Sequence, residues 1–148
     1  MNRLKVVAFF VLALTFFSSA FAGDKEDILA TINKTIKDFN SKDYAAYYTS
    51  FADEYDVFAT SNTPLRHDMA SWKRFIDGLA TLSVVEYQQQ DNVIRVFNGD
   101  AATVSAYYVF KVQPPGATMV VESGRASIIY AKQKGKWLIA HMHFSKLF

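Results

Sequence analysis

The chain has 148 residues, of which 51% are hydrophobic, and this is enough material for one domain with its own core. It contains no cysteine, which excludes disulfides, thiolate catalysis and lipid attachment through cysteine. The formal net charge of +2 is too small for a basic surface that would hold nucleic acid or anionic lipid.

Residues 1–22 have the pattern of a secretory signal peptide. Arg3 and Lys5 supply a charged start, residues 6–17 form an uncharged, largely apolar stretch, and residues 20–22 (Ala-Phe-Ala) form a small-x-small cleavage site. The alternative is a membrane-spanning helix, but such a helix needs about 20 apolar residues. We therefore expect cleavage and a secreted or periplasmic protein that has no membrane attachment afterwards.

The mature chain, residues 23–148, is predicted to form a single domain. The loss of Arg3 and Lys5 reduces the 16 basic residues to 14, which equals the number of acidic residues. The mature net charge is then zero, and no nucleic acid partner is expected.

Three helices are predicted early in the mature chain. Asp24 can cap the first, which ends near Asn40, and Asp43 starts a short second helix. Asp68 caps the third. The apolar residues at helical spacing are Ile28, Ile32, Ile36 and Phe39 in the first helix, Tyr44, Tyr47, Tyr48 and Phe51 in the second, and Trp72, Phe75, Ile76 and Leu79 in the third.

Strands are predicted for most of the remaining chain. They cover Tyr55–Thr60, Ser83–Gln90, Asn92–Phe97, Ala101–Val112, Met119–Lys132 and Lys136–Phe148. Asn98 and Gly99 mark a hairpin, because both turn positions need positive φ. The order, helices first and then a long antiparallel meander, predicts an α+β domain with its helices packed on one face of the sheet.

One face of the predicted sheet is strongly apolar and should meet the helices. Because side chains alternate along a strand, this face is assigned Val104, Ala106, Tyr108, Phe110 and Val112, then Ala126, Ile128 and Tyr130, and finally Leu138, Ala140, Met142 and Phe144.

The last strand carries polar side chains at period two, which places Trp137, His141, His143 and Ser145 on one face. A three-residue loop over residues 133–135, with Gly135 in the left-handed conformation, would pair Lys132 with Lys136.

Counting outward from that loop sets Ser127 opposite His141 and Arg125 opposite His143, whereas a two-residue turn would set Arg125 opposite Phe144. We therefore predict a polar ladder, defined here as Arg125, Ser127, His141 and His143.

These residues resemble a known family. The resemblance rests on residues 125–127 (Arg-Ala-Ser), residues 135–137 (Gly-Lys-Trp), residues 141–145 (His-Met-His-Phe-Ser) and residues 51–56 (Phe-Ala-Asp-Glu-Tyr-Asp). They look like the nuclear transport factor 2-like superfamily, and within it small SnoaL-like domains and the association domain of calcium/calmodulin-dependent kinase. The resemblance spans residues 24–148.

This resemblance implies a cone-shaped roll, in which a strongly curved antiparallel sheet wraps around a helix-lined pocket, and frequent dimerisation through the sheet. Members include ketosteroid isomerases, dehydratases, polyketide cyclases and non-enzymatic binding domains, so the fold leaves the function open. The catalytic motifs of the isomerases and dehydratases are not visible in this chain.

Several aromatic residues could line such a pocket and hold a flat or apolar small molecule. The predicted ligand-binding residues are Tyr48, Phe51, Trp72, Tyr108, Tyr130 and Met142. Aromatic rows at regular spacing also occur as plain core, which is the alternative here.

His141 and His143 allow three interpretations. A zinc site needs three or four ligands, and the remaining histidine, His67, is expected in a distant loop, so no metal and no cofactor are predicted. The pair could act as an acid–base device in the pocket, or the polar ladder could lie on the outer side of the sheet and stabilise a dimer. Asp56 could serve as a base or be solvated, and Asp53 is expected to cap a helix-to-strand turn.

The sequence thus predicts an exported domain that binds a small apolar or aromatic ligand, as a homodimer formed through the sheet. One alternative is a small lyase or isomerase of the ketosteroid-isomerase or dehydratase type, with a histidine or Asp56 as its base. The other is a structural dimerisation module.

Overall fold

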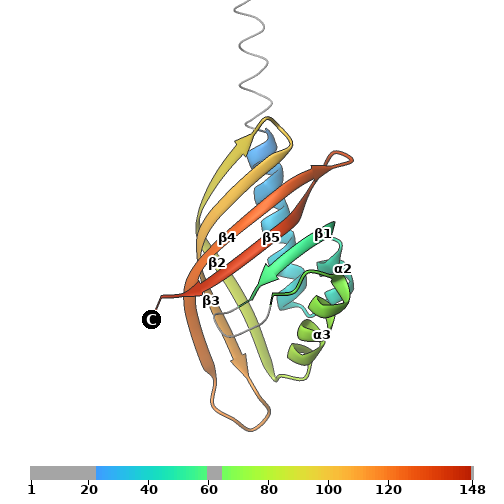
Figure 1. The fold of residues 1–148 in the computed structure, drawn as a ribbon. Coiled ribbons are helices and arrows are strands. Elements are labelled where there is room, and N and C mark those ends of the chain that lie inside the picture. The colour runs from blue at the N-terminus through green and yellow to red at the C-terminus, as the bar shows by residue number, and fades with distance from the viewer. Residues whose placement is uncertain (1–22, 60–64, 148) are drawn as a thin grey trace, which may run out of the picture.

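The computed structural model describes residues 23–59 and 65–147, so the predicted signal peptide lies outside the described residues (Figure 1). A first helix covers residues 23–40. It is followed by α2 (Tyr44–Tyr48), β1 (Phe51–Phe58), α3 (Met69–Ala80), β2 (Val84–Phe97), β3 (Ala101–Gln113), β4 (Val120–Gln133) and β5 (Lys136–Lys146).

The strands form one curved sheet in the order β1-β5-β4-β3-β2. All neighbours are antiparallel except β1 and β5, which run parallel. The first helix lies along one face of this sheet, and α2 and α3 lie beside β1 (Figure 1). The predicted α+β roll, with three helices on a strongly curved sheet, is confirmed.

Two of the three predicted helix caps are present. The side chain of Asp43 accepts a hydrogen bond from the Ala46 amide at 3.1 Å, and Asp68 accepts one from the Ser71 amide at 2.6 Å. Each satisfies an amide that a helix start leaves without an intrahelical partner.

The prediction that Asp24 caps the first helix is wrong. Asp24 lies within the helix and is buried. Its Oδ1 accepts hydrogen bonds from Lys132 Nζ at 2.6 Å and from Trp137 Nε1 at 3.2 Å. The carboxylate therefore ties the helix to the β4–β5 hairpin, because a buried charge is stable when it is paired and hydrogen-bonded.

The far end of the first helix is tied to the opposite edge of the sheet. Asn40, the predicted last residue of this helix, donates to the Tyr87 carbonyl at 2.9 Å and accepts from the Tyr87 amide at 2.8 Å. The helix is thus fixed at β2 on one side and at the β4–β5 hairpin on the other, which holds it across the sheet.

Two strand predictions differ from the structure. β1 starts at Phe51 rather than Tyr55, because it pairs in parallel with β5, a contact that local patterns do not reveal. The two predicted strands Ser83–Gln90 and Asn92–Phe97 are one strand, β2. A bulge at Asp91, where φ is 56°, shifts its pairing with β3 without ending it.

Of the two predicted hairpin turns, the one at Asn98 and Gly99 is confirmed and the one between β4 and β5 is not. Asn98 and Gly99 adopt φ of 52° and 78°, as predicted. In the β4–β5 hairpin Gln133 pairs with Lys136, so the connection is a two-residue turn and the predicted three-residue loop is wrong. The turn residues both have positive φ, which suits the tight turns of twisted hairpins.

A bulge then changes which side chains of β5 face the core. Ile129 pairs with His141 and Tyr130 pairs with Ile139, so Ala140 is an extra residue. A shift of one residue moves all following side chains to the other face. The core consequently holds Trp137 and Ile139 together with Met142 and Phe144, while the predicted Leu138 and Ala140 are not part of it.

The predicted cross-strand partners change for the same reason. Ser127 pairs with His143 rather than His141, and Arg125 pairs with Ser145 rather than His143. Trp137, predicted on the same face as the histidines, is buried on the opposite one.

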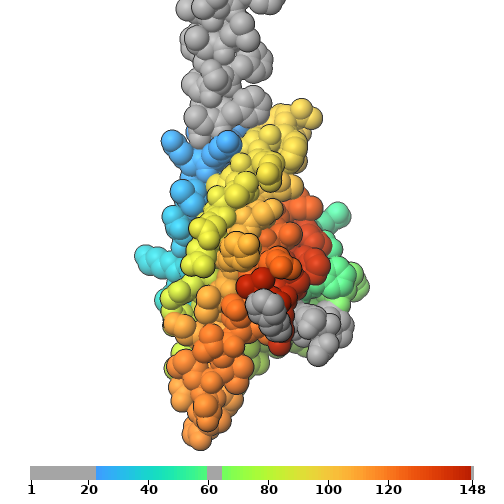
Figure 2. All heavy atoms as spheres, turned by 90° about the vertical axis from the view of Figure 1, so that its left-hand side faces the viewer, coloured from blue at the N-terminus to red at the C-terminus, as the bar shows by residue number. Residues whose placement is uncertain are grey.

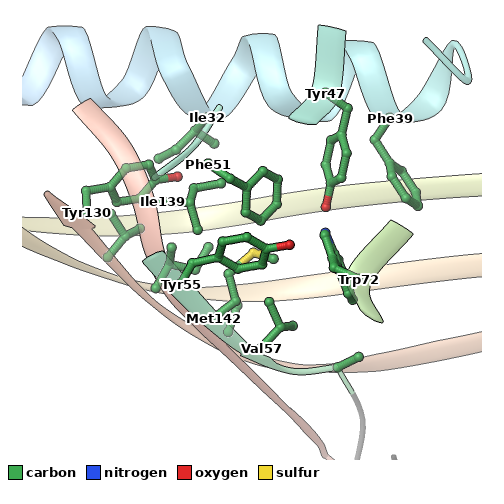
Figure 3. Close-up of a cluster of buried hydrophobic side chains, with 14 of the residues drawn as sticks. Ile32, Phe39, Tyr47, Phe51, Tyr55, Val57, Trp72, Tyr130, Ile139 and Met142 are labelled. Carbon is green, nitrogen blue, oxygen red and sulfur yellow. The ribbon is translucent and has the colours of Figure 1, made fainter. Parts of the chain in front are cut away.

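The core lies between the helices and the concave face of the sheet (Figure 3). The predicted apolar faces of β3 and β4 are confirmed for Val104, Ala106, Tyr108, Ala126, Ile128 and Tyr130, which are buried. Phe110 is partly buried against the core, and Val112 is not part of it.

Candidate functional site

A cavity of about 100 Å³ lies between the first helix, α3 and the concave face of the sheet. Its walls are almost entirely apolar or aromatic. They include Ile32, Phe39, Tyr47, Trp72, Phe75, Tyr87, Tyr108, Ile128, Tyr130, Met142 and Phe144. Several of these side chains project into the same space in Figure 3.

Four of the six predicted ligand-binding residues line this cavity: Trp72, Tyr108, Tyr130 and Met142. Tyr48 and Phe51 do not. Phe51 begins β1 and is buried in the core, and the ring of Tyr48 lies 4.9 Å from the ammonium of Lys73 on α3.

Other lining residues were not singled out from the sequence. Phe39, Tyr47 and Phe75 were assigned only to helix faces, although their helical spacing was the available signal. Tyr87 lies in a segment without clear alternation, and only the bulged pairing of β2 with β3 places its side chain over the cavity.

The indole of Trp72 lies at the α3 side of the cavity. It stacks on Phe75, with ring centroids 5.2 Å apart and an interplanar angle of 20°. Only 4% of Trp72 is exposed, and its Nε1 is buried.

The hydroxyl of Tyr47 faces this indole nitrogen (Figure 3). Burial raises the pKa of Tyr47 well above its ordinary value, and a side-chain hydrogen bond with Trp72 opposes this by a smaller amount. Because an indole nitrogen can only donate, the Tyr47 hydroxyl oxygen is the acceptor in this contact.

At the other side of the cavity two tyrosine hydroxyls are paired. The Tyr108 hydroxyl donates to Glu122 Oε1 at 2.6 Å, and Glu122 Oε2 lies 2.8 Å from Lys146 Nζ. The Tyr87 hydroxyl donates to Gln89 Oε1 at 2.9 Å. Burial, and next the hydrogen bond to Glu122, raise the pKa of Tyr108.

Gly124 makes the position of Tyr108 possible. A β-carbon at residue 124 would lie 2.5 Å from Cε1 of Tyr108 and would overlap the backbone oxygen of Ser145. Because glycine has no side chain, the Tyr108 ring can lie against β4 and reach Glu122.

The polar ladder lies on the outer face of the sheet, and none of its four residues lines the cavity. Figure 2 shows strands of the sheet exposed on this side. His141 Nδ1 is 2.9 Å from Asp56 Oδ2 on the neighbouring strand β1, and Phe58 packs edge-on against both histidine rings.

Two predictions about β1 need correction. Asp56 is paired with His141 rather than simply solvated. Asp53 lies exposed within β1 and caps no helix-to-strand turn, because β1 already begins at Phe51.

Within residues 23–59 and 65–147, no group of three or more His, Cys, Asp or Glu side chains is placed to hold a metal ion. No helix of the same residues has the length and apolar character needed to cross a membrane.

A family model described as the SnoaL-like domain matches residues 28–148. No curated protein matches the sequence. Among solved structures, the chain resembles a candidate scytalone dehydratase from Novosphingobium aromaticivorans, with a TM-score of 0.81, 10% identity and coverage of 88% of this chain and 89% of that one.

Two further structures are similar. A candidate dehydratase of the NTF2-like family from Streptomyces avermitilis has a TM-score of 0.76 and 13% identity, and the match covers 86% of this chain and 98% of that one. The association domain of C. elegans CaMKII has a TM-score of 0.67 and 17% identity, with coverage of 84% and 96%. At these identities the likeness shows the fold alone.

Proposed function

The chain belongs to the SnoaL-like domain family, and from that premise we propose that it binds a small apolar or aromatic molecule in the cavity between the first helix and the sheet. The observation that carries this proposal is the apolar, aromatic lining of a half-open cavity between the first helix, α3 and the sheet. Such a cavity with a few placed polar groups is the usual form of a small-molecule site.

The volume limits the size of the molecule. Pockets for larger ligands measure about 300–1,000 Å³, whereas an engineered apolar cavity of about 150 Å³ admits benzene. The cavity of about 100 Å³ is smaller than both and is half-open, so a molecule with one ring would fit by extending toward the opening or by turning aromatic side chains of the wall, and a larger ligand would need more of both.

A lyase or isomerase is the second candidate, and two structural neighbours are described as candidate dehydratases. This candidate has less support from the geometry. His141, His143 and Asp56, the predicted bases, do not line the cavity, and the one carboxylate among its lining residues, Glu122, already has both oxygens engaged. A general base must reach its substrate directly or through one water.

Binding can be tested by thermal unfolding of the purified protein with toluene, α-methylstyrene and naphthalene. A ligand that binds only the folded state raises the melting temperature, and saturation at 100 times Kd adds about 2.7 kcal/mol to the free energy of unfolding. We expect a shift with at least one single-ring hydrocarbon. No shift with any of the three would contradict the proposal.

Two adjacent isoleucines provide matched controls. Ile128 lines the cavity and Ile129 is exposed on the outer face. Ile128→Phe should fill the cavity and abolish the ligand-induced shift, and Ile129→Phe should preserve it.

Export is also proposed, supported by the signal-peptide pattern of residues 1–22. N-terminal sequencing of the protein recovered outside the cytoplasm should give a chain that starts at Gly23. Recovery of a chain that still starts at Met1 would contradict cleavage.

A homodimer formed through the outer face completes the proposal. Phe58, Tyr107 and Ile129 are exposed hydrophobic residues on that side, close to the polar ladder, and one structural neighbour is an association domain. Sedimentation analysis should give a dimer that Ile129→Asp converts to a folded monomer. A monomeric wild-type protein at micromolar concentration would contradict this part.

A further inference from the structure

We propose that His141 and His143 form half of a zinc site on the outer face of the sheet, and that the same pair of a second copy of the chain completes it. The inference rests on the dimer of the proposed function and deepens it, because it assigns the ion that joins the two copies.

The two histidines stand side by side on β5. Met142, which lies between them, is buried in the core, and side chains alternate along a strand, so both imidazoles project from the outer face. Phe58 on β1 packs edge-on against both rings, with centroids 6.4 Å from His141 and 5.6 Å from His143. Residues i and i+2 of a strand are about 6.6 Å apart, and two imidazoles that lean together across this spacing can reach one ion.

The nitrogens of the pair are available, and one ring is already oriented. Nδ1 of His141 lies 2.9 Å from Asp56 Oδ2. Nε2 of His141 and both nitrogens of His143 have no hydrogen-bond partner in the described part of the chain. A carboxylate that holds one ring nitrogen and leaves the other for the metal is the usual support of a zinc-binding histidine. The pair thus offers two imidazole ligands in the form that zinc accepts.

One chain cannot close the site. Within residues 23–59 and 65–147, no third His, Cys, Asp or Glu is grouped with the pair to hold an ion, and a zinc site takes three or four protein ligands. A symmetric dimer places the same patch of both copies around its two-fold axis. An axis that passes beside His141 and His143 therefore brings four imidazoles together, which is the number that tetrahedral zinc needs.

The surroundings of the pair suit a site that a second copy covers. Ile129 lies opposite His141 on β4, Phe58 lies opposite His143 on β1, and both of these apolar side chains are exposed. Association would remove their surface from water. The two Asp56 carboxylates of a dimer would also balance the two positive charges of one zinc ion, and a buried charge is stable when it is paired. The outer face thus supplies the ligands, the compensating charge and an apolar rim.

The test measures association by sedimentation equilibrium of protein purified without a histidine tag, in EDTA and with half an equivalent of zinc chloride per chain. Because the complete site exists only in the dimer, zinc should tighten the dimer dissociation constant by at least about tenfold. Isothermal titration should give one zinc ion per two chains. Binding of one ion per chain without a change in association would overturn the inference.

His143→Gln and His67→Gln form a matched pair of variants. Each removes one imidazole, but the side chain of His67 is 70% exposed beside Asp68 and, among the described residues, is not grouped with the other two histidines. His143→Gln should abolish the response to zinc, and His67→Gln should keep it. The melting temperature in EDTA checks that both variants fold. Equal responses of the two variants would place the ion elsewhere and overturn the inference.

Asp56 is a positioning residue in this site. Asp56→Asn keeps the size of the side chain and removes its charge, so it should weaken zinc binding about tenfold. Association in EDTA should change by less than about twofold, because the pair is partly exposed. A purely structural role of Asp56 would change both measurements alike.

The wild-type comparison needs no variant and separates the inference from the proposed function. A dimer of equal affinity in zinc and in EDTA would overturn the inference and leave the proposed dimer in place. A protein that is monomeric under both conditions would contradict the inference and the proposed dimer together.

Discussion

The concave and outer faces of the sheet are built from the same strands, yet they carry different chemistry. The cavity lies over the concave face, where tyrosines and aliphatic side chains predominate and Glu122 is the one carboxylate among the described lining residues. The outer face carries Arg125, His143 and the Asp56–His141 pair.

The difference shows that the predicted acid–base residues His141, His143 and Asp56 are separated by the sheet from the space suited to a small molecule. The histidine pair is the most conspicuous motif of the sequence, but it faces away from the cavity. The function proposed for the cavity therefore depends on its apolar packing.

The largest test of this comparison uses the adjacent residues Ile128 and Ile129, which lie on opposite faces. Ile128 is 4% exposed and Ile129 is 43% exposed. Ile128→Ala should lower the free energy of unfolding by about 3 kcal/mol, and Ile129→Ala by less than about 1 kcal/mol. Urea denaturation at low protein concentration, where a dimer dissociates, measures both. Equal losses would show that the outer face is packed as tightly as the core.

A smaller effect is expected where β4 approaches Tyr108. Gly124→Ala should cost about 2 kcal/mol, because the new methyl group meets the Tyr108 ring and the Ser145 backbone. Gly78 in α3 provides a control, since nothing lies within 4 Å of a β-carbon there. Gly78→Ala should stabilise the protein by about 0.5–1 kcal/mol in the same urea assay. A neutral Gly124→Ala would mean that the ring can move away.

Local features of the fold could be predicted from the sequence. The caps at Asp43 and Asp68 and the turn at Asn98 and Gly99 depend only on neighbouring residues. In β3 and β4 every second side chain is apolar, because one face of these strands is buried against the helices. These features were predicted correctly because the physical cause lies within a few residues of the effect.

Features that depend on distant partners could not be predicted. The parallel pairing of β1 with β5 joins segments far apart in the chain. The bulge at Ala140 is defined by the pairing of β5 with β4, which the local sequence of β5 does not reveal. The same limit applies to the buried pairing of Asp24 with Lys132 and Trp137.

The candidate site was predictable in part for the same reasons. Trp72, Tyr108, Tyr130 and Met142 lie at spacings that face the helix–sheet interior. Phe51 was misplaced because α2 ends after little more than one turn and the chain changes to a strand, which removes the helical spacing assumed for it.

The concave face should also respond to high pH. Burial raises the pKa of Tyr87 and of Tyr130 above the ordinary value of 10. As pH rises past about 10, the unfolded chain loses phenolic protons that the folded protein keeps. The free energy of unfolding should then fall by about 1.4 kcal/mol per pH unit for each such tyrosine.

Tyr130→Phe isolates one of these contributions. Its free energy of unfolding should fall with pH less steeply than that of the wild type above pH 10, by about 1.4 kcal/mol per unit. Below pH 9 the difference between the two proteins should be constant. Parallel curves at all pH values would contradict burial of the Tyr130 hydroxyl.

The smallest effect is expected on the outer face, at the Asp56–His141 pair. The side chains are 40% and 25% exposed, so water and salt screen their attraction. A double-mutant cycle with Asp56→Asn and His141→Gln should give a coupling energy below about 1 kcal/mol at pH 6, and less in 0.5 M NaCl. The pair lies on the outer face, where a second copy of the chain could cover it and remove the screening by solvent. A coupling energy above about 2 kcal/mol that depends on protein concentration would therefore mean that a second copy buries the pair. That result would favour the proposed dimer, whereas a large coupling in a monomer would contradict the distinction between the two faces.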